Sequence, residues 1–231
     1  MIKVEYIDVY GFKAAIRGLR NPMNSWDKSD SGYSCVQNAK ELCDPHCTAD
    51  NYCNKQSSKF IIGKNDLDLM RRLYKAGTEH RKYLRQIIVS MDITAPLYWW
   101  KEFDTYKVGT VANSCSTMHK IAAKEFELDD FSHEHLINIS EAVMVEMCRV
   151  LNTWRHLYLE SRDKEDWWQL IQLLPTSYNQ KRTITMNYEN VMTIIRQRTG
   201  HKLDEWNNMV DILRNLPYVE DIIDEPANIT N

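Results

Sequence analysis

The sequence contains no apolar run long enough to span a lipid bilayer and no large surplus of charge of either sign. A transmembrane helix needs about 20 predominantly apolar residues, and no stretch approaches that length. The formal net charge is −3 over 231 residues, so a broad attraction to nucleic acid or to an anionic membrane is not expected. Any anion site in this protein must therefore be local.

Signals for export, internal repeats and low-complexity tracts are also missing. The N-terminal segment MIKVEYIDVYGFKAAIRG lacks the positive segment, apolar run and small-residue cleavage site of a signal peptide. We therefore expect a cytoplasmic protein. With 43% hydrophobic and 26% charged residues, the composition is that of a globular chain. Its length suits a single domain, residues 1–231, that carries an insertion.

The cysteines do not have the spacing typical of zinc ribbons or zinc fingers, whose paired ligands lie two to four residues apart on tight turns. Seven, three and five residues separate the members of one group, Cys35, Cys43, Cys47 and Cys53. The surrounding residues 29–58 are polar and have no apolar period, so we interpret them as an insertion. Zinc bound by these thiolates would stabilise an insertion without a core of its own. Free thiols are the alternative.

Hydrophobic periodicity predicts an α+β protein. Strands are expected at residues 3–11, 87–93 and 181–187. Helices are expected over residues 12–20, 66–77, 78–86, a segment from Pro96, 132–174 with a second helix from 163, 188–198 and 203–217. Asn65 or Asp66 can cap the second of these helices. The acidic tail after Pro217 is expected to be loosely held.

Three segments, in this order, resemble the flavin-dependent thymidylate synthase family, also called ThyX. They are HRKYLRQIIVSMDI, PLYWWKEFDTYKVGTVANSCSTMH and LLPTSYNQKRTITMNYENVMTIIRQR. In that family a strand leads into a helix that delivers an Arg-His-Arg-x-x-Ser motif, and a later block runs from Leu-Pro through a strand to an arginine-bearing helix. The resemblance covers about residues 78–213. It implies a small, mainly antiparallel sheet surrounded by helices, with the cysteine-containing insertion outside it.

The resemblance also implies a pocket for a flavin and a nucleotide. By position, the flavin-binding residues would be His80, Lys107, Thr110 and Asn187. The nucleotide-binding residues would be Asn113, Ser114, Cys115 and Arg198. No side chain is expected to attack the pyrimidine, because sites of this family act by positioning the nucleotide against the flavin ring.

The signature motif of the family is altered in this chain. Thr105, Tyr106 and Lys107 replace Arg-His-Arg, and Thr110 replaces the serine. A lysine supplies a point charge where a guanidinium fork binds two oxygens at once. Glu189 stands where the family often has an arginine. Cations nevertheless gather in the three segments and predict a basic cavity: Arg81, Lys82, Arg85, Lys101, Lys107, Lys181, Arg182, Arg196 and Arg198.

The function implied by the resemblance is C5 methylation of a uracil nucleotide, dUMP to dTMP. Methylenetetrahydrofolate would donate the carbon, reduced FAD the hydride, and NADPH would be a further co-substrate. The family forms homotetramers, so a homotetramer is expected, with no membrane or nucleic-acid partner. Two alternatives remain open. One is a nucleotide-binding or sequestering protein, or an enzyme for a different pyrimidine, on the same fold. The other is an interaction scaffold stapled by zinc.

Overall fold

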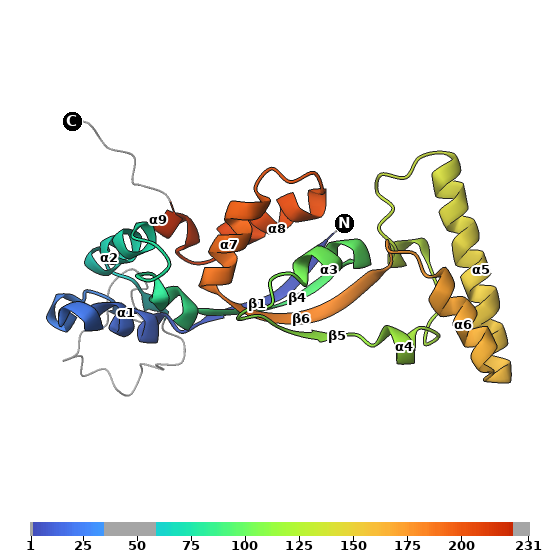
Figure 1. The fold of residues 1–231 in the computed structure, drawn as a ribbon, viewed down its shortest axis with the longest axis horizontal. Coiled ribbons are helices and arrows are strands. Elements are labelled where there is room, and N and C mark those ends of the chain that lie inside the picture. Colours follow the sequence, from blue (N-terminus) through green and yellow to red (C-terminus); the bar gives the residue numbers. More distant parts are fainter. Residues whose placement is uncertain (1, 35–58, 224–231) are drawn as a thin grey trace. The chain divides into compact units, whose positions relative to one another are not determined.

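The computed structural model describes residues 2–34 and 59–223 (Figure 1). The chain divides into two compact units. The first comprises Met1–Asp8, Ser90–Thr185 and Arg198–Met209, and the second comprises Val9–Val89, Met186–Gln197 and Val210–Asn231. No described helix is long and apolar enough to cross a membrane.

A four-stranded sheet has the order β1-β4-β6-β5. Its strands are β1 (Lys3–Tyr10), β4 (Ile88–Pro96), β6 (Asn179–Asn187) and β5 (Val111–Ser114). The three long strands confirm the sequence prediction. Strand β5 was not predicted, since its four residues are all exposed and show no alternation. It pairs antiparallel with β6, with Val111 opposite Thr185 and Ser114 opposite Arg182.

In the first unit, α3 (Leu97–Phe103) begins directly after β4. Pro96 is its N-cap, with φ −69° and ψ 153°, and so ends the strand and starts the helix, as predicted. The helix packs on one face of the sheet (Figure 1), and its residues Trp99, Trp100 and Phe103 are fully buried. The tryptophan pair is therefore core, and alternate β4 residues such as Met91 and Ile93 are buried as well.

Two helices lie side by side further along the first unit (Figure 1). They are α5 (Ile139–Ser161) and α6 (Lys164–Leu173). The helix predicted from residue 132 begins only at Ile139, after the short η5 (Leu128–Asp130) and an irregular segment. Asp163 caps α6 by accepting a hydrogen bond from the Glu165 N–H at 3.0 Å. Leu151 and Leu170 lie in a small core with Phe126 and Phe131.

The second unit contains most of the remaining helices. They are α1 (Phe12–Arg20), η1 (Asn21–Met23), η2 (Trp26–Lys28), α2 (Lys64–Lys75), η4 (Lys82–Gln86) and α9 (Val219–Ile223). Gly11 precedes α1 at φ +98°, and a Cβ there would lie 2.0 Å from the Gln86 carbonyl oxygen. Only glycine fits this position. The helices α7 (Tyr188–Arg198) and α8 (Asp204–Arg214) confirm the last two predicted helices.

Three local predictions in the second unit were wrong. Residues 78–86 form a turn followed by the 3₁₀ helix η4 instead of an α-helix. Gly63 is the N-cap of α2. Asp66 is buried in an ion pair with Arg20, and the Asp30 carboxylate accepts the Asn65 and Asp66 N–H groups at 2.9 and 3.1 Å. Beyond Pro217 the chain forms α9, whose residues Val219 and Ile222 are buried, so this part of the tail is held by apolar contacts.

The insertion predicted at residues 29–58 has only its base in the described structure. Strands β2 (Gly32–Tyr33) and β3 (Phe60–Ile61) pair antiparallel, so the chain leaves and returns at neighbouring positions. Residues 35–58, with the cysteines Cys35, Cys43, Cys47 and Cys53, lie outside the described residues.

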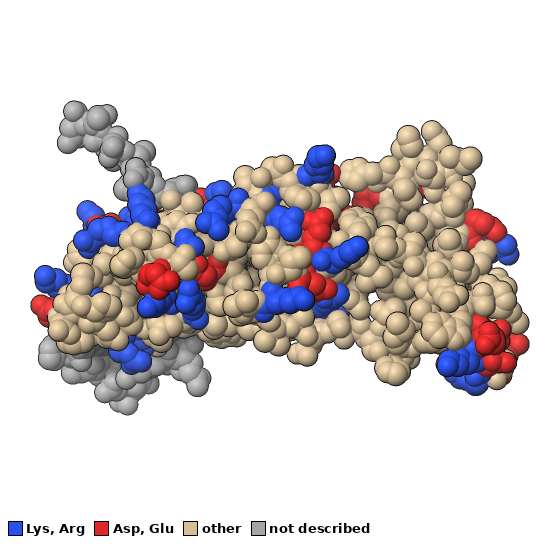
Figure 2. Space-filling model, in the orientation of Figure 1, with Lys and Arg blue, Asp and Glu red and all other residues tan. Residues whose placement is uncertain are grey.

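On the visible surface, Lys and Arg are interspersed with Asp and Glu (Figure 2).

Candidate functional site

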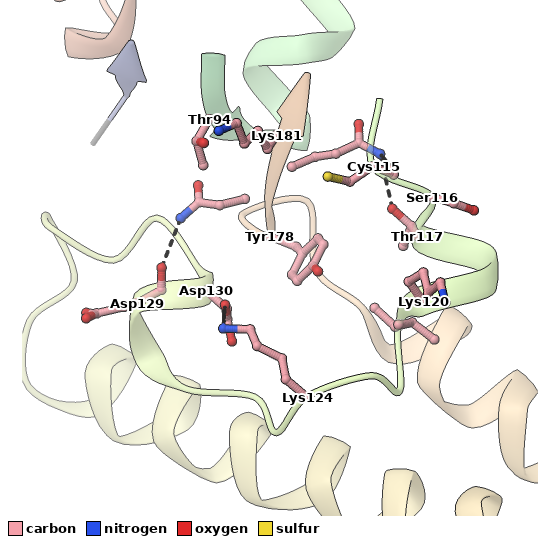
Figure 3. A pocket seen from close by; sticks show the side chains of 13 residues that line it. Thr94, Cys115, Ser116, Thr117, Lys120, Lys124, Asp129, Asp130, Tyr178 and Lys181 are labelled. Carbon is pink, nitrogen blue, oxygen red and sulfur yellow. Dashed lines mark hydrogen bonds and ion pairs between the residues drawn. The ribbon is translucent and has the colours of Figure 1, made fainter. Parts of the chain in front are cut away.

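A cavity of about 250 Å³ lies in the first unit, where β5 ends and α4 (Thr117–Lys120) and β6 begin (Figure 3). It is lined by Thr94, Cys115, Ser116, Thr117, Lys120, Ile121, Lys124, Asp129, Asp130, Tyr178, Asn179, Gln180 and Lys181. Gln180 holds the two sides together. Its Nε2 donates to the Cys115 carbonyl at 3.0 Å and to Thr117 Oγ1 at 3.1 Å. The Cys115 N–H donates to the Lys181 carbonyl at 2.9 Å.

Three lysines and two aspartates, Asp129 and Asp130, give this cavity its charge. Lys181 Nζ lies 2.9 Å from Asp92 Oδ2, and that hydrogen bond raises the pKa of the lysine. Lys124 Nζ lies 2.5 Å from Asp130 Oδ1, which raises its pKa likewise. Both stay protonated at neutral pH. Lys120 forms no ion pair with any described residue. Of the three lysines in the lining, it is therefore the one whose charge is available to bind an anion.

Neutral hydrogen-bonding groups complete the lining. Burial raises the pKa of Tyr178, so its phenol remains a donor (Figure 3). Asn179 donates through Nδ2 to the Asp129 carbonyl at 3.3 Å, while its buried Oδ1 has no hydrogen-bond partner among the described residues. The hydroxyl of Ser116 accepts the His119 N–H at 3.3 Å and caps α4. The cavity thus offers both donors and acceptors beside its cations.

The predicted nucleotide-binding residues of the first unit are only partly brought to this cavity. Cys115 lines it, with an exposed thiol. Asn113 and Ser114 lie on exposed β5, opposite Thr183 and Arg182, and do not line it. Sequence reasoning did not assign Lys120, which closes α4. A signal was present, since Lys120 lies three residues after Thr117, the last of the small polar residues that follow the altered motif.

Arg198 is held in a polar cluster of the first unit. Its Nε donates to the Tyr106 hydroxyl at 2.9 Å, and its Nη1 donates to Glu102 Oε2 at 2.6 Å. Trp206 Nε1 donates to the same Glu102 oxygen at 3.0 Å, and the guanidinium lies 4.5 Å from the centre of a Trp206 ring. Glu102 therefore balances the charge of Arg198 and orients it.

The altered motif forms an irregular turn after α3. Lys107 is exposed, and the Thr110 N–H donates to its carbonyl at 3.5 Å. Gly109 between them has φ +78°, a conformation that favours glycine. The Thr110 hydroxyl is buried and makes no hydrogen bond with a described residue. A ligand group is one partner that would satisfy it.

The other two predicted flavin-binding residues, His80 and Asn187, belong to the second unit. His80 is exposed. Asn187 Oδ1 accepts the Asn190 N–H at 3.1 Å, so Asn187 is the N-cap of α7. In the same unit Arg81 Nε lies 2.9 Å from Glu189 Oε1. The acidic residue that replaces an arginine in the resemblance is therefore paired with a neighbouring arginine.

The arginines of the predicted basic cavity are largely neutralised. Arg182 Nη1 lies 2.7 Å from Asp104 Oδ1, with the guanidinium 4.2 Å from a Trp100 ring centre. Arg81 and Arg198 also pair with carboxylates. Among the described residues, no group of three or more His, Cys, Asp or Glu side chains could hold a metal ion. Cys148, the other described cysteine, is buried and free.

Comparisons with known proteins address the fold. No protein-family profile matches the sequence, and no curated protein matches it. A crystal structure of thymidylate synthase X (ThyX) from Helicobacter pylori with FAD and dUMP is similar, with TM-score 0.65 and 16% identity. The match covers 96% of this chain and 99% of that one. A second structure of flavin-dependent thymidylate synthase ThyX from Helicobacter pylori, complexed with FAD and dUMP, gives TM-score 0.61 and 15% identity over 96% and 97% of the two chains. The chain therefore has a ThyX-like fold, as the sequence predicted.

Proposed function

We propose that this protein binds a uracil nucleotide and FAD and methylates the nucleotide at C5, with methylenetetrahydrofolate and NADPH as co-substrates. The observation that carries the proposal is the extent of the structural likeness. It covers 96% of this chain and 99% of a chain whose structure contains FAD and dUMP, so nearly the whole length of that chain has a counterpart here. Fold alone does not fix function, and the proposal therefore rests also on the cavity.

The cavity suits the phosphate of a nucleotide. Lys120 supplies a cation without a carboxylate partner among the described residues, and Thr117 supplies a hydroxyl, whereas Lys181 and Lys124 are paired with Asp92 and Asp130. Lysines bind phosphate as point charges, whereas arginine forks bind two oxygens with fixed geometry. A volume of about 250 Å³ lies just below the range of small-molecule sites, about 300–1,000 Å³. The cavity therefore accommodates the phosphate end of the nucleotide, and the base must extend beyond it.

The residues of the altered motif fit a bound flavin in one respect. The Thr110 hydroxyl is buried without a partner, and the ammonium of Lys107 is exposed on the same turn, so the turn can offer a donor and a positive charge to a phosphate oxygen. When bound, the flavin would supply the hydride of the reaction. The chain's own residues bind and orient the nucleotide, and none is proposed as a nucleophile.

The altered motif favours a second candidate. Thr105, Tyr106 and Lys107 stand in place of Arg-His-Arg, and the loss of the guanidinium forks weakens the binding of the flavin phosphates. A protein that binds or sequesters a nucleotide, with no flavin chemistry, would tolerate this loss. The two candidates differ in the retention of flavin and in the methylation that depends on it.

The first experiment is an absorbance spectrum of the purified protein, repeated after addition of FAD and desalting. Retained flavin bands support the enzyme, and conversion of dUMP to dTMP is then assayed directly. A colourless protein that fails to retain added FAD contradicts the enzyme. If such a protein still binds dUMP by calorimetry, the second candidate replaces it.

The cavity itself is tested by Lys120→Gln. We expect the affinity for dUMP to fall about tenfold or more, because a hydrogen bond to a charged group contributes about 1.5–3 kcal/mol. Lys202→Gln is the matched control, since Lys202 is an exposed lysine of the same unit outside the cavity lining. Equal dUMP affinities of the two variants would place the nucleotide elsewhere.

A further inference from the structure

A second cavity lies in the second unit, between α1, η2 and the β2–β3 hairpin, and the proposed function makes no use of it. Its volume is about 300 Å³. It is lined by Lys13, Ile16, Arg17, Arg20, Trp26, Ser29, Ser31, Gly32, Tyr33 and Phe60. The lining contains three cations, three aromatic rings and no carboxylate.

The polar floor of this cavity is held rigidly. Arg20 and Asp66 form an ion pair at 2.7 Å with side chains 5% and 0% exposed. The hydroxyls of Ser29 and Ser31 donate to the other oxygen of Asp66 at 2.7 and 2.6 Å. These groups satisfy one another. Arg20 is therefore neutralised, and the floor fixes the shape of the cavity without attracting a ligand by charge.

The aromatic walls are also fixed in place. Trp26 is 52% exposed, and its Nε1 donates to Asn21 Oδ1 at 2.8 Å, which sets the plane of the indole. Tyr33 and Phe60 are opposite each other in the hairpin, with ring centres 5.5 Å apart and planes at 82°. Exposed aromatic rings held by neighbouring contacts offer ready-made surfaces for a planar ligand.

Two cations remain available beside these rings. Lys13 and Arg17 lie four residues apart on α1, hence on one face of the helix. Both are exposed and neither forms an ion pair with a residue in 2–34 or 59–223. The ammonium of Lys13 lies 5.4 Å from the centre of the Tyr33 ring, so positive charge and aromatic wall are directly adjacent.

We propose that this second cavity binds an aromatic anion, that is, a planar ring carrying a phosphate or a carboxylate. The ring would stack on Trp26 or Tyr33, and the anionic group would meet Arg17 and Lys13. A guanidinium can bind two oxygens of either group, and stacking on aromatic side chains accepts many different rings. A volume of about 300 Å³ limits the ligand to about the size of one nucleotide.

Isothermal titration calorimetry on the full chain tests this site with four probes: AMP, adenosine, benzoate and inorganic phosphate. We expect AMP or benzoate to bind at least tenfold more tightly than adenosine or phosphate, because only the first two join a ring to an anionic group. Tighter binding of AMP identifies a phosphate ligand, and tighter binding of benzoate a carboxylate ligand. Binding of neither overturns the proposal.

Variants separate this site from the cavity of the first unit. Arg17→Gln should weaken the bound probe at least tenfold, and Arg72→Gln, an exposed arginine of α2 outside the lining, should leave it unchanged. Thermal melting verifies that each variant folds, and Lys13→Gln replaces Arg17→Gln if that variant does not. Binding that survives both Arg17→Gln and Lys13→Gln but is lost in Lys120→Gln overturns the inference. Because dUMP also joins a ring to a phosphate, the unaltered chain should show two classes of dUMP site, of which Arg17→Gln weakens one and Lys120→Gln the other.

Discussion

At the scale of single residues, Asp66 is a charged side chain in the interior of the second unit. Its carboxylate is fully buried and accepts hydrogen bonds from Arg20, Ser29 and Ser31. Burial by itself would raise its pKa, but these hydrogen bonds outweigh burial and hold the pKa below the ordinary value. Asp66 joins α1, η2 and α2, so the packing of these helices depends on its charge.

Asp66→Asn should destabilise the protein by about 3–5 kcal/mol, because it leaves the Arg20 guanidinium buried without a counter-charge. Urea denaturation followed by circular dichroism measures the change. Asp68→Asn is the control, since its carboxylate is 50% exposed and pairs at the surface with Arg71, where a pair is worth about 0–1 kcal/mol. Equal losses in the two variants would contradict a special role for the buried pair.

The depressed pKa of Asp66 also predicts a dependence of stability on pH. A carboxyl whose pKa is lower in the folded chain contributes stability that is fully present above its unfolded pKa, about 3.9, and is lost as pH falls through the folded value. The free energy of unfolding should therefore decrease below about pH 4, and Asp66→Asn should flatten this decrease. If the free energy of unfolding of the variant decreases just as steeply below about pH 4, other carboxyls cause the decrease.

Glu102 determines how much charge Arg198 presents to a ligand. Glu102→Gln keeps a hydrogen-bond acceptor for Arg198 and Trp206 but removes the balancing charge. If Arg198 contacts the nucleotide as the resemblance to the ThyX family implies, we expect the affinity for dUMP to rise several-fold, as titration calorimetry would show. Glu160→Gln, an exposed glutamate of the same unit, should have no effect. Unchanged affinity in Glu102→Gln would mean that Arg198 only joins α3 to Trp206.

At the scale of elements, Asn187 joins the end of β6 to the start of α7. Asn187→Ala should destabilise the protein by about 1 kcal/mol, and Asn187→Ser by less, because serine also caps helices. Thermal melting measures this effect, and flavin retention is measured in parallel. Loss of flavin in both variants would give Asn187 a ligand-binding role besides the cap. Retention in both would leave it with the cap alone.

The elements that could be predicted from the sequence are those with a strong local signal. Strand β4 alternates buried and partly exposed residues, and Pro96 ends it where α3 begins. Strand β5 could not be predicted, because its pairing with β6 depends on residues about seventy positions further along the chain. The helix expected at residues 78–86 failed for a related reason. Tyr83 and Leu84 are buried by tertiary contacts in a 3₁₀ turn, and such contacts override helix propensity.

The site residues divide in the same way, into those with a local sequence signal and those whose contacts depend on the fold. Cys115 could be predicted as a binding residue because it follows the aromatic helix in a segment that resembles the ThyX family. The structure places it in the cavity of the first unit. The partners of the predicted arginines could not be found this way. Asp104 and Glu102 are separated in sequence from Arg182 and Arg198 by 78 and 96 positions. Only the fold brings these charges together, and of the nine cations expected to form a basic cavity, Lys181 alone lines the cavity of the first unit.

At the scale of the whole molecule, the first half of α5 exposes apolar side chains that the described chain does not cover. Ile139, Val143 and Val145 are 78%, 59% and 55% exposed, while Leu151 on the same helix is fully buried against α6 and its neighbours. Part of the surface over α5 and α6 carries few charged side chains in Figure 2. Ile139 and Val143 lie four residues apart, hence on one face of α5, and exposed apolar surface of this kind is characteristic of interaction sites.

We expect this surface to be buried between copies of the chain, in the homotetramer that the resemblance to the ThyX family implies. The double variant Ile139→Glu, Val143→Glu should then dissociate the assembly, because burying two carboxylates without partners opposes association by several kcal/mol. Sedimentation velocity would show a smaller species, with an unchanged circular dichroism spectrum. Glu141→Gln is the control, because it removes a charge on the same helix and keeps the size of the side chain. An unaltered sedimentation coefficient in the double variant would leave α5 outside the subunit interface. A smaller species that still binds dUMP would show that the cavity of the first unit is complete within one chain.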